Sequence, residues 1–139
     1  MPNLKINHLA VFVCVILLHI LGFLWYGPLF GERWMELVEL DPERMEGSGG
    51  AGMWITNFLA QLAPVYFLAW LFTKLNVTSG GRGAAIAFAI TFCFHHLSLM
   101  SGNMFSGEHY GLAWIVGGFS IIGLTLSGFI LGTWTKTNN

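Results

Sequence analysis

Five polar side chains lie within stretches of the chain that are otherwise apolar. They are three histidines and two amides: His19, Asn57, Gln61, His95 and His96. Imidazole and amide groups can hydrogen-bond to one another, ligate a metal ion or haem, or relay protons, so these residues are the candidates for any chemistry. No nucleophile is paired with a base, and no phosphate-binding glycine loop follows a strand, which argues against an enzyme.

The stretches that carry these side chains are long enough to cross a bilayer. Of the 139 residues, 55% are hydrophobic and only 9% are charged, whereas soluble domains contain about 25% charged residues. Four blocks, about 9–26, 53–75, 84–102 and 112–134, can each cross a hydrocarbon layer of about 30 Å. Because lipid offers no partner for backbone groups, such blocks must be helical. We expect an all-α membrane protein, a single domain with four transmembrane helices in two hairpins.

The first block also has features of a secretory signal peptide, because Lys5 precedes its apolar core. A signal peptidase requires small residues after that core. This chain instead has Phe23, Trp25 and Tyr26 there, aromatic residues that suit the boundary between lipid and water. We therefore expect the first helix to remain in the protein.

The charged residues predict the orientation of the helices. All seven acidic residues fall in the first and third connectors, where the only basic residues are Arg33 and Arg44. The opposite side has no acid and four basic residues: Lys5, Lys74, Arg82 and Lys136. Because connectors rich in Lys and Arg stay in the cytoplasm, we expect both termini to be cytoplasmic.

The long connector after the first block, residues 27–52, combines an acidic part with a glycine-rich tether. Residues 32–40 place Trp34 and Leu37 on one side and glutamates on the other. This spacing predicts a short amphipathic helix in the outer interface, or a continuation of the first helix past Pro28. A further helical turn is predicted to begin at Asp41, followed by a flexible tether over residues 47–52.

Similar segments end the first and third blocks: Gly27-Pro-Leu-Phe30-Gly-Glu32 and Gly102-Asn-Met-Phe105-Ser-Gly-Glu108. Each follows a block that contains histidine. The pattern is compatible with a parallel internal repeat of two hairpins, and a match this short also arises by coincidence.

Three motifs occur in order along most of the chain: Gly22-x-x-Trp25-Tyr-Gly-Pro28-x-Phe30-Gly31-x-x-Trp34-Met35, Asn103-x-Phe105 and Gly128-x-Ile130-Leu-Gly132-x-Trp134. In these motifs the chain resembles the small bacterial membrane proteins catalogued as domain of unknown function 1761. The resemblance implies a four-span membrane protein and no assigned activity, and we expect the protein in the bacterial inner membrane. The His95-His96 pair and the glycine-rich tether do not match features of that family.

Counting 1.5 Å per residue along each block places the five polar residues near the bilayer middle, with Asn57 one turn further out. An unpaired imidazole or amide is costly in hydrocarbon, so we expect these side chains to hydrogen-bond across helices. Helical phase puts His95 on a small, polar face together with Thr91. We therefore expect His95 to point into the bundle and His96 to point elsewhere.

Three hypotheses are open for this polar layer. It is a set of structural hydrogen bonds, worth roughly 0.6 kcal/mol each, or a metal or haem site built on His19 and His95. The third hypothesis is a path for protons or polar solutes, lined by a carbonyl that Pro64 frees beside Gln61. No metal-binding spacing supports the second hypothesis, so we expect no metal and no cofactor.

Glu108 and His109, in the outer connector, are either solvated or able to hold a cation.

The fourth block is rich in small residues that let helix backbones approach closely, among them Gly118, Thr125, Gly128 and Gly132. This face packs within the bundle or against another subunit. Because four helices enclose little interior, we expect a homo-oligomer or a place in a larger membrane complex. The sequence has no cluster of basic residues, so we expect no nucleic-acid binding.

These observations favour a non-catalytic integral membrane protein that acts through helix packing. The alternative is a small transporter, or a protein that binds a ligand or metal through its mid-membrane layer of His, Asn and Gln side chains.

Overall fold

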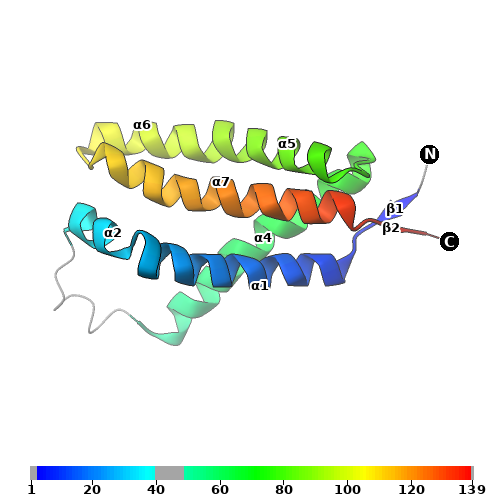
Figure 1. The fold of residues 1–139 in the computed structure, drawn as a ribbon, viewed down its shortest axis with the longest axis horizontal. Helices are drawn as coiled ribbons and strands as arrows, with labels where there is room; N and C mark the ends of the chain where they lie inside the picture. Colours follow the sequence, from blue (N-terminus) through cyan, green and yellow to red (C-terminus); the bar gives the residue numbers. More distant parts are fainter. Residues whose placement is uncertain (1–2, 40–48, 139) are drawn as a thin grey trace.

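The computed structural model describes residues 3–39 and 49–138, and four helical rods make up the described part of the molecule (Figure 1). The rods that are long and apolar enough to cross a membrane are His8–Leu29, Ala51–Leu75, Gly80–Ser106 and Tyr110–Thr133. The predicted all-α membrane architecture with four transmembrane helices is therefore confirmed. The helical turn predicted at Asp41 and the start of the glycine-rich tether lie outside the described residues.

The first rod consists of α1 (His8–Leu24) and a π-helical turn η1 (Trp25–Leu29), and the short helix α2 (Gly31–Val38) follows it. Pro28 has no N–H to donate and disfavours helical geometry at the residue before it, so the regular helix is interrupted at Gly27. A Cβ on Gly31 would collide with the carbonyl of Tyr26, so only glycine lets α2 start so close to the kink. The predicted amphipathic segment is this helix, and it buries Leu37 and packs on α7.

The third rod consists of α5 (Gly80–Ile90), a π-helical turn η2 (Thr91–His96) and α6 (Leu97–Ser106). It packs along α7 (Tyr110–Thr133), the helix that follows it in the chain. The two backbones touch where Gly83 faces Gly128, and a Cβ on Gly128 would lie 2.6 Å from the Cβ of Ala87. Glycine at these positions therefore sets the spacing between α5 and α7.

The small residues predicted to share one face of α7 are divided between two neighbours. Gly128 and Gly132 face α5 and the residues just before it, whereas a Cβ on Gly118 would lie 3.3 Å from the Trp25 ring in η1. Thr125 is half-buried, and its hydroxyl has no partner within the described residues. The three glycines therefore pack within the bundle, as one of the two alternatives predicted, but against neighbours on two flanks of α7.

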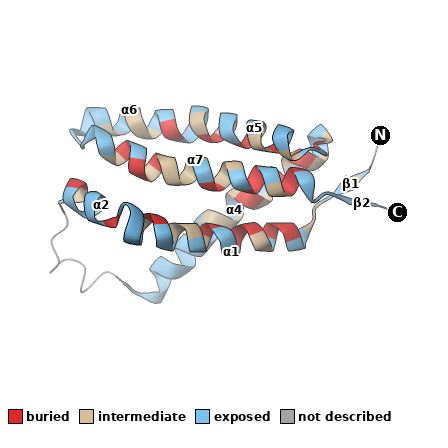
Figure 2. Ribbon diagram, viewed as in Figure 1, coloured by how far each residue is buried: buried red, intermediate tan, exposed pale blue. Residues whose placement is uncertain are grey.

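Helix α4 (Ala51–Leu75) crosses behind the layer formed by the other helices (Figure 1). Its second half packs into the apolar core, where Val65, Leu68 and Phe72 are buried. Residues 51–60 are all exposed, and Figure 2 shows this half of α4 extending beyond the layer. The helix is therefore held by the bundle along only half of its length.

The two ends of the chain meet in a small antiparallel ribbon of β1 (Leu4–Lys5) and β2 (Lys136–Thr137). Leu4 pairs with Thr137, and Lys5 pairs with Lys136. Both termini therefore lie at the same end of the bundle (Figure 1), as an even number of membrane crossings requires. We call the opposite end, where α2 and the connector between α6 and α7 lie, the outer end.

The close approach of α5 and α7 predicts different effects of the same substitution at two glycines. Gly128→Ala should lower the free energy of unfolding by about 1–3 kcal/mol, because its Cβ overpacks the contact with α5. Gly102→Ala is the matched control, since a Cβ there meets no atom within 4 Å, and it should be neutral or slightly stabilising. Unfolding in mixed micelles, followed by circular dichroism, measures both; equal effects would contradict the packing described.

Candidate functional site

Two cavities lie along α4, one beside its exposed half and one beside Ala60, Gln61 and Pro64. The outer cavity, about 430 Å³, lies between α4 and α1, and Phe119 of α7 also lines it. The inner cavity, about 390 Å³, lies between α4, η2 and α7. Gln61 and Phe119 line both cavities, so they mark the boundary between them. We call this combined space, between residues 51–64 of α4 and the facing parts of α1, η2 and α7, the α4 wedge.

Four of the five polar residues singled out from the sequence line the α4 wedge. His19 and Asn57 line the outer cavity, His95 lines the inner cavity, and Gln61 lines both. Thr91 and Ser120 add hydroxyl groups to the inner cavity. The wedge thus brings together polar side chains from α1, α4, η2 and α7.

The expectation that these side chains hydrogen-bond across helices is not met within the described residues. The His19 Nδ1 lies 2.8 Å from the carbonyl oxygen of Val15 in its own helix, and the ring lies against Phe58 with centroids 5.8 Å apart. The buried Oε1 of Gln61 has no hydrogen-bond partner there. The polar layer lines an opening in the fold and does not join the helices.

The structure does not place His19 and His95 in the same cavity. Within the described residues, no group of three or more His, Cys, Asp or Glu side chains is arranged to hold a metal ion. The geometry therefore gives no support to a metal or haem site built on this pair of histidines.

The expectation that His95, and not His96, points into the bundle is wrong. His96 is fully buried against α7, with its ring centroid 4.5 Å from that of Trp114, whereas His95 is exposed and lines the α4 wedge. The cause is the π-helical turn η2. The buried face follows Gly83, Ala87 and Thr91 at intervals of four and then jumps five residues to His96, because a π turn closes hydrogen bonds from i to i+5.

The fit of His96 depends on a glycine. A Cβ on Gly117 would collide with the His96 ring, so only glycine leaves room for it on α7. Neither ring nitrogen of His96 has a hydrogen-bond partner within the described residues. We therefore assign His96 a packing position outside the α4 wedge.

Trp25, one of the aromatic residues expected to suit the boundary between lipid and water, is buried against α7. Its Nε1 donates a hydrogen bond of 2.9 Å to the carbonyl of Ile115 on α7, and its ring lies 4.6 Å from that of Phe30. This contact fixes the outer end of α1. The cluster of aromatic residues around Gly27 and Pro28 is a sequence feature from which a packed contact at this end of α1 could be predicted. Nothing in the sequence distinguishes Phe119 from the other phenylalanines, of which the chain has 12 in all.

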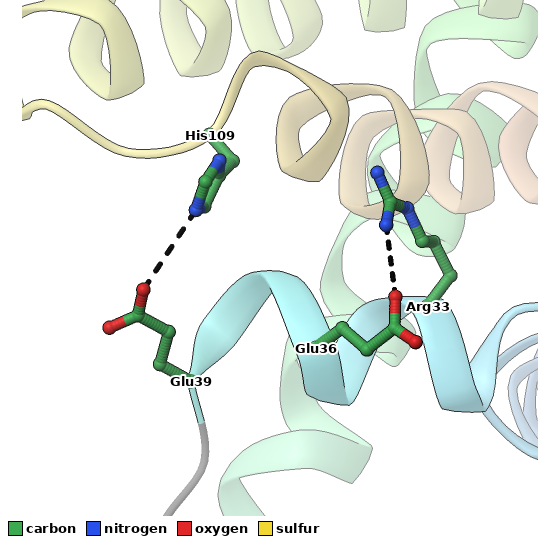
Figure 3. Close-up of polar contacts among 4 residues, drawn as sticks. All are labelled: Arg33, Glu36, Glu39 and His109. Carbon is green, nitrogen blue, oxygen red and sulfur yellow. Dashed lines mark hydrogen bonds and ion pairs between the residues drawn. The ribbon is translucent and has the colours of Figure 1, made fainter.

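The outer end carries polar contacts at its surface, drawn in Figure 3. Arg33 Nη1 lies 2.9 Å from Glu36 Oε2, and His109 Nε2 lies 4.0 Å from Glu39 Oε1. The four side chains are 58–83% exposed, and such surface pairs contribute little to stability. The second contact joins the first connector to the third.

The packing of His96 against Gly117 predicts strong coupling between the two positions. Gly117→Ala alone should destabilise the protein by about 1–3 kcal/mol through overpacking. In a His96→Ala background, the same change should cost little, because the ring it would strike is gone. A double-mutant cycle on unfolding free energies measures the coupling, and additive effects would show that the two residues do not touch.

Comparisons with known proteins give one match. The family model described as "Protein of unknown function (DUF1761)" matches residues 9–132, a range that contains the α4 wedge and most of all four membrane helices. No curated protein and no solved structure matches the chain. Since the match takes in nearly the whole described fold, the chain belongs to the family catalogued as domain of unknown function 1761.

Proposed function

We propose that this membrane protein is non-catalytic and acts through helix packing, as a homo-oligomer or as an accessory subunit of a larger membrane complex. The observation that carries the proposal is the unpacked half of α4. Its large apolar side chains Met53, Trp54, Ile55, Phe58 and Leu59 are 41–64% exposed. In a bilayer, transmembrane helices are held in place by packing against other helices. A further helix along residues 51–60 would supply that packing.

Other helix faces are less suited to a partner. The glycines of α7 that would permit close approach are already occupied by α5, by the residues before it, and by the first rod. The surface that we propose for oligomer formation is therefore the exposed half of α4, and its neighbour would be a second copy of the same helix in a homo-oligomer.

We further propose that the protein lies in the bacterial inner membrane with both termini in the cytoplasm. The four basic residues opposite the acidic connectors support this orientation. Lys5 and Lys136 lie in the terminal ribbon, Lys74 in the last turn of α4 and Arg82 in the first turn of α5. Positive residues favour the cytoplasmic side. A green fluorescent protein fused to the C-terminus should fluoresce; a dark fusion at normal expression would contradict the orientation.

A second candidate function is the binding of a ligand dissolved in the membrane. It is favoured by the α4 wedge, where His19, Asn57, Gln61 and His95 line two adjacent openings. Cavities of this size fall within the range of about 300–1,000 Å³ that is usual for small-molecule sites. The two functions use the same part of α4, because Met53 and Trp54 line the outer cavity and are also among its exposed apolar side chains.

The homo-oligomer predicts disulfide cross-linking at α4. In a background with Cys14→Ala and Cys93→Ser, Leu59→Cys should give a covalent dimer under mild oxidation. Leu126→Cys on α7 is the matched control, since both leucines are 54% exposed, and it should stay monomeric. The mass of the complex in mild detergent should be a multiple of 15.4 kDa. A monomeric mass together with no cross-link at Leu59 would contradict the homo-oligomer.

A further inference from the structure

We propose that the α4 wedge binds a lipid-soluble phenol, meaning a neutral molecule with a hydroxyl-bearing aromatic ring and a hydrocarbon tail. The inference rests on the second candidate function, ligand binding, and names its ligand class. Three features of the wedge carry it: the hydrogen-bonding sense of its polar atoms, the chemistry of its walls, and the side from which it opens.

Three groups of the wedge can accept a hydrogen bond from a ligand, beside the amide nitrogens of Asn57 and Gln61, which donate. Because the carbonyl of Val15 can only accept, the bond to His19 requires the proton on Nδ1, which leaves Nε2 of the neutral ring as an acceptor. Gln61 Oε1 is buried and has no partner within the described residues. Pro64 has no N–H to donate to the carbonyl of Ala60, and both residues line the inner cavity. A ligand that donates hydrogen bonds would satisfy these groups.

The walls of the wedge are aromatic and carry no formally charged side chain. Tyr26, Trp54 and Phe119 line the outer cavity, and Phe94 joins Phe119 in the inner one. Aromatic walls favour a ring that can stack or meet them edge to face. A phosphate or ammonium head group would be buried without an opposite charge, which is strongly unfavourable. The head group is therefore a neutral ring that carries its donor as a hydroxyl.

The wedge opens toward hydrocarbon. Residues 51–60 of α4 are exposed along their length, and they lie within a helix long and apolar enough to cross the membrane. A ligand therefore enters sideways from the lipid and leaves its tail there. This route selects molecules that dissolve in the bilayer.

The test compares two probes that differ in one donor: 2-bromo-4-dodecylphenol and its methyl ether. Bromine quenches tryptophan on contact, and Trp54 lies in the wall of the outer cavity. With the full chain in lipid nanodiscs, quenching by the phenol should saturate at about tenfold lower concentration than quenching by the ether, as expected for one or two net hydrogen bonds. Trp54→Phe should remove the saturable part of the signal.

Two variants locate the donor contact. Gln61→Met keeps the shape of the side chain and removes its acceptor, so the preference for the phenol should fall to about twofold or less. Thr125→Val is the matched control, because Thr125 Oγ1 is also buried without a partner but does not line either cavity. Its preference should match that of the wild type. If Gln61→Met does not fold, His19→Phe tests the second acceptor in the same way.

The outcomes separate the ligand class from the function on which it rests. Saturable quenching by both probes with equal affinity would overturn the phenol and leave a wedge that binds amphiphiles by shape alone. No saturable quenching by either probe would overturn both the phenol and the ligand-binding function. A preference that is lost equally in Gln61→Met and Thr125→Val would also overturn the proposal, because the effect would not come from the wedge.

Discussion

The contact between the backbones of α5 and α7 at Gly83 and Gly128 determines how the other helices are arranged. With no side chain between them, these two helices form a tight pair, and α1 packs on the other flank of α7 near Gly118 and Gly123. Three rods thus form one layer, with α7 in the middle (Figure 1). The remaining helix, α4, can only lie across one face of that layer. Because α4 crosses the layer at an angle, only its second half packs against the other helices. The wedge opens beside its first half.

The same geometry explains where the polar residues lie. In hydrocarbon, a polar side chain is stable where it meets another polar group or lines an opening. The wedge provides such an opening for His19, Asn57, Gln61 and His95. His96 does not line the wedge. The π turn directs its side chain toward α7, where the absence of a side chain at Gly117 leaves room for the ring. Two adjacent histidines therefore have separate roles, one in packing and one in the wall of the wedge.

The main architecture could be read from the sequence because it follows from the length and polarity of the blocks. The four blocks predict the helices, and the amphipathic spacing around Trp34 and Leu37 predicts α2. The roles of His95 and His96 could not be read, because a π turn adds one residue to the helical repeat and leaves no mark in composition. Which glycines of α7 face α1 and which face α5 also depends on the angles at which these helices cross. Hydropathy does not encode those angles, and Phe119 became visible as a wall residue only once α7 was placed.

Pulsed electron paramagnetic resonance can measure directly whether α4 diverges from the layer. Spin labels at Ala60→Cys and Phe94→Cys would span the inner cavity, and labels at Arg82→Cys and Phe129→Cys would report on α5 and α7 where they touch. Both pairs would be built in a chain with Cys14→Ala and Cys93→Ser. An open wedge predicts a clearly longer separation for the first pair than for the second. Equal, short separations in lipid nanodiscs would show that α4 lies flat on η2, and the wedge would not exist.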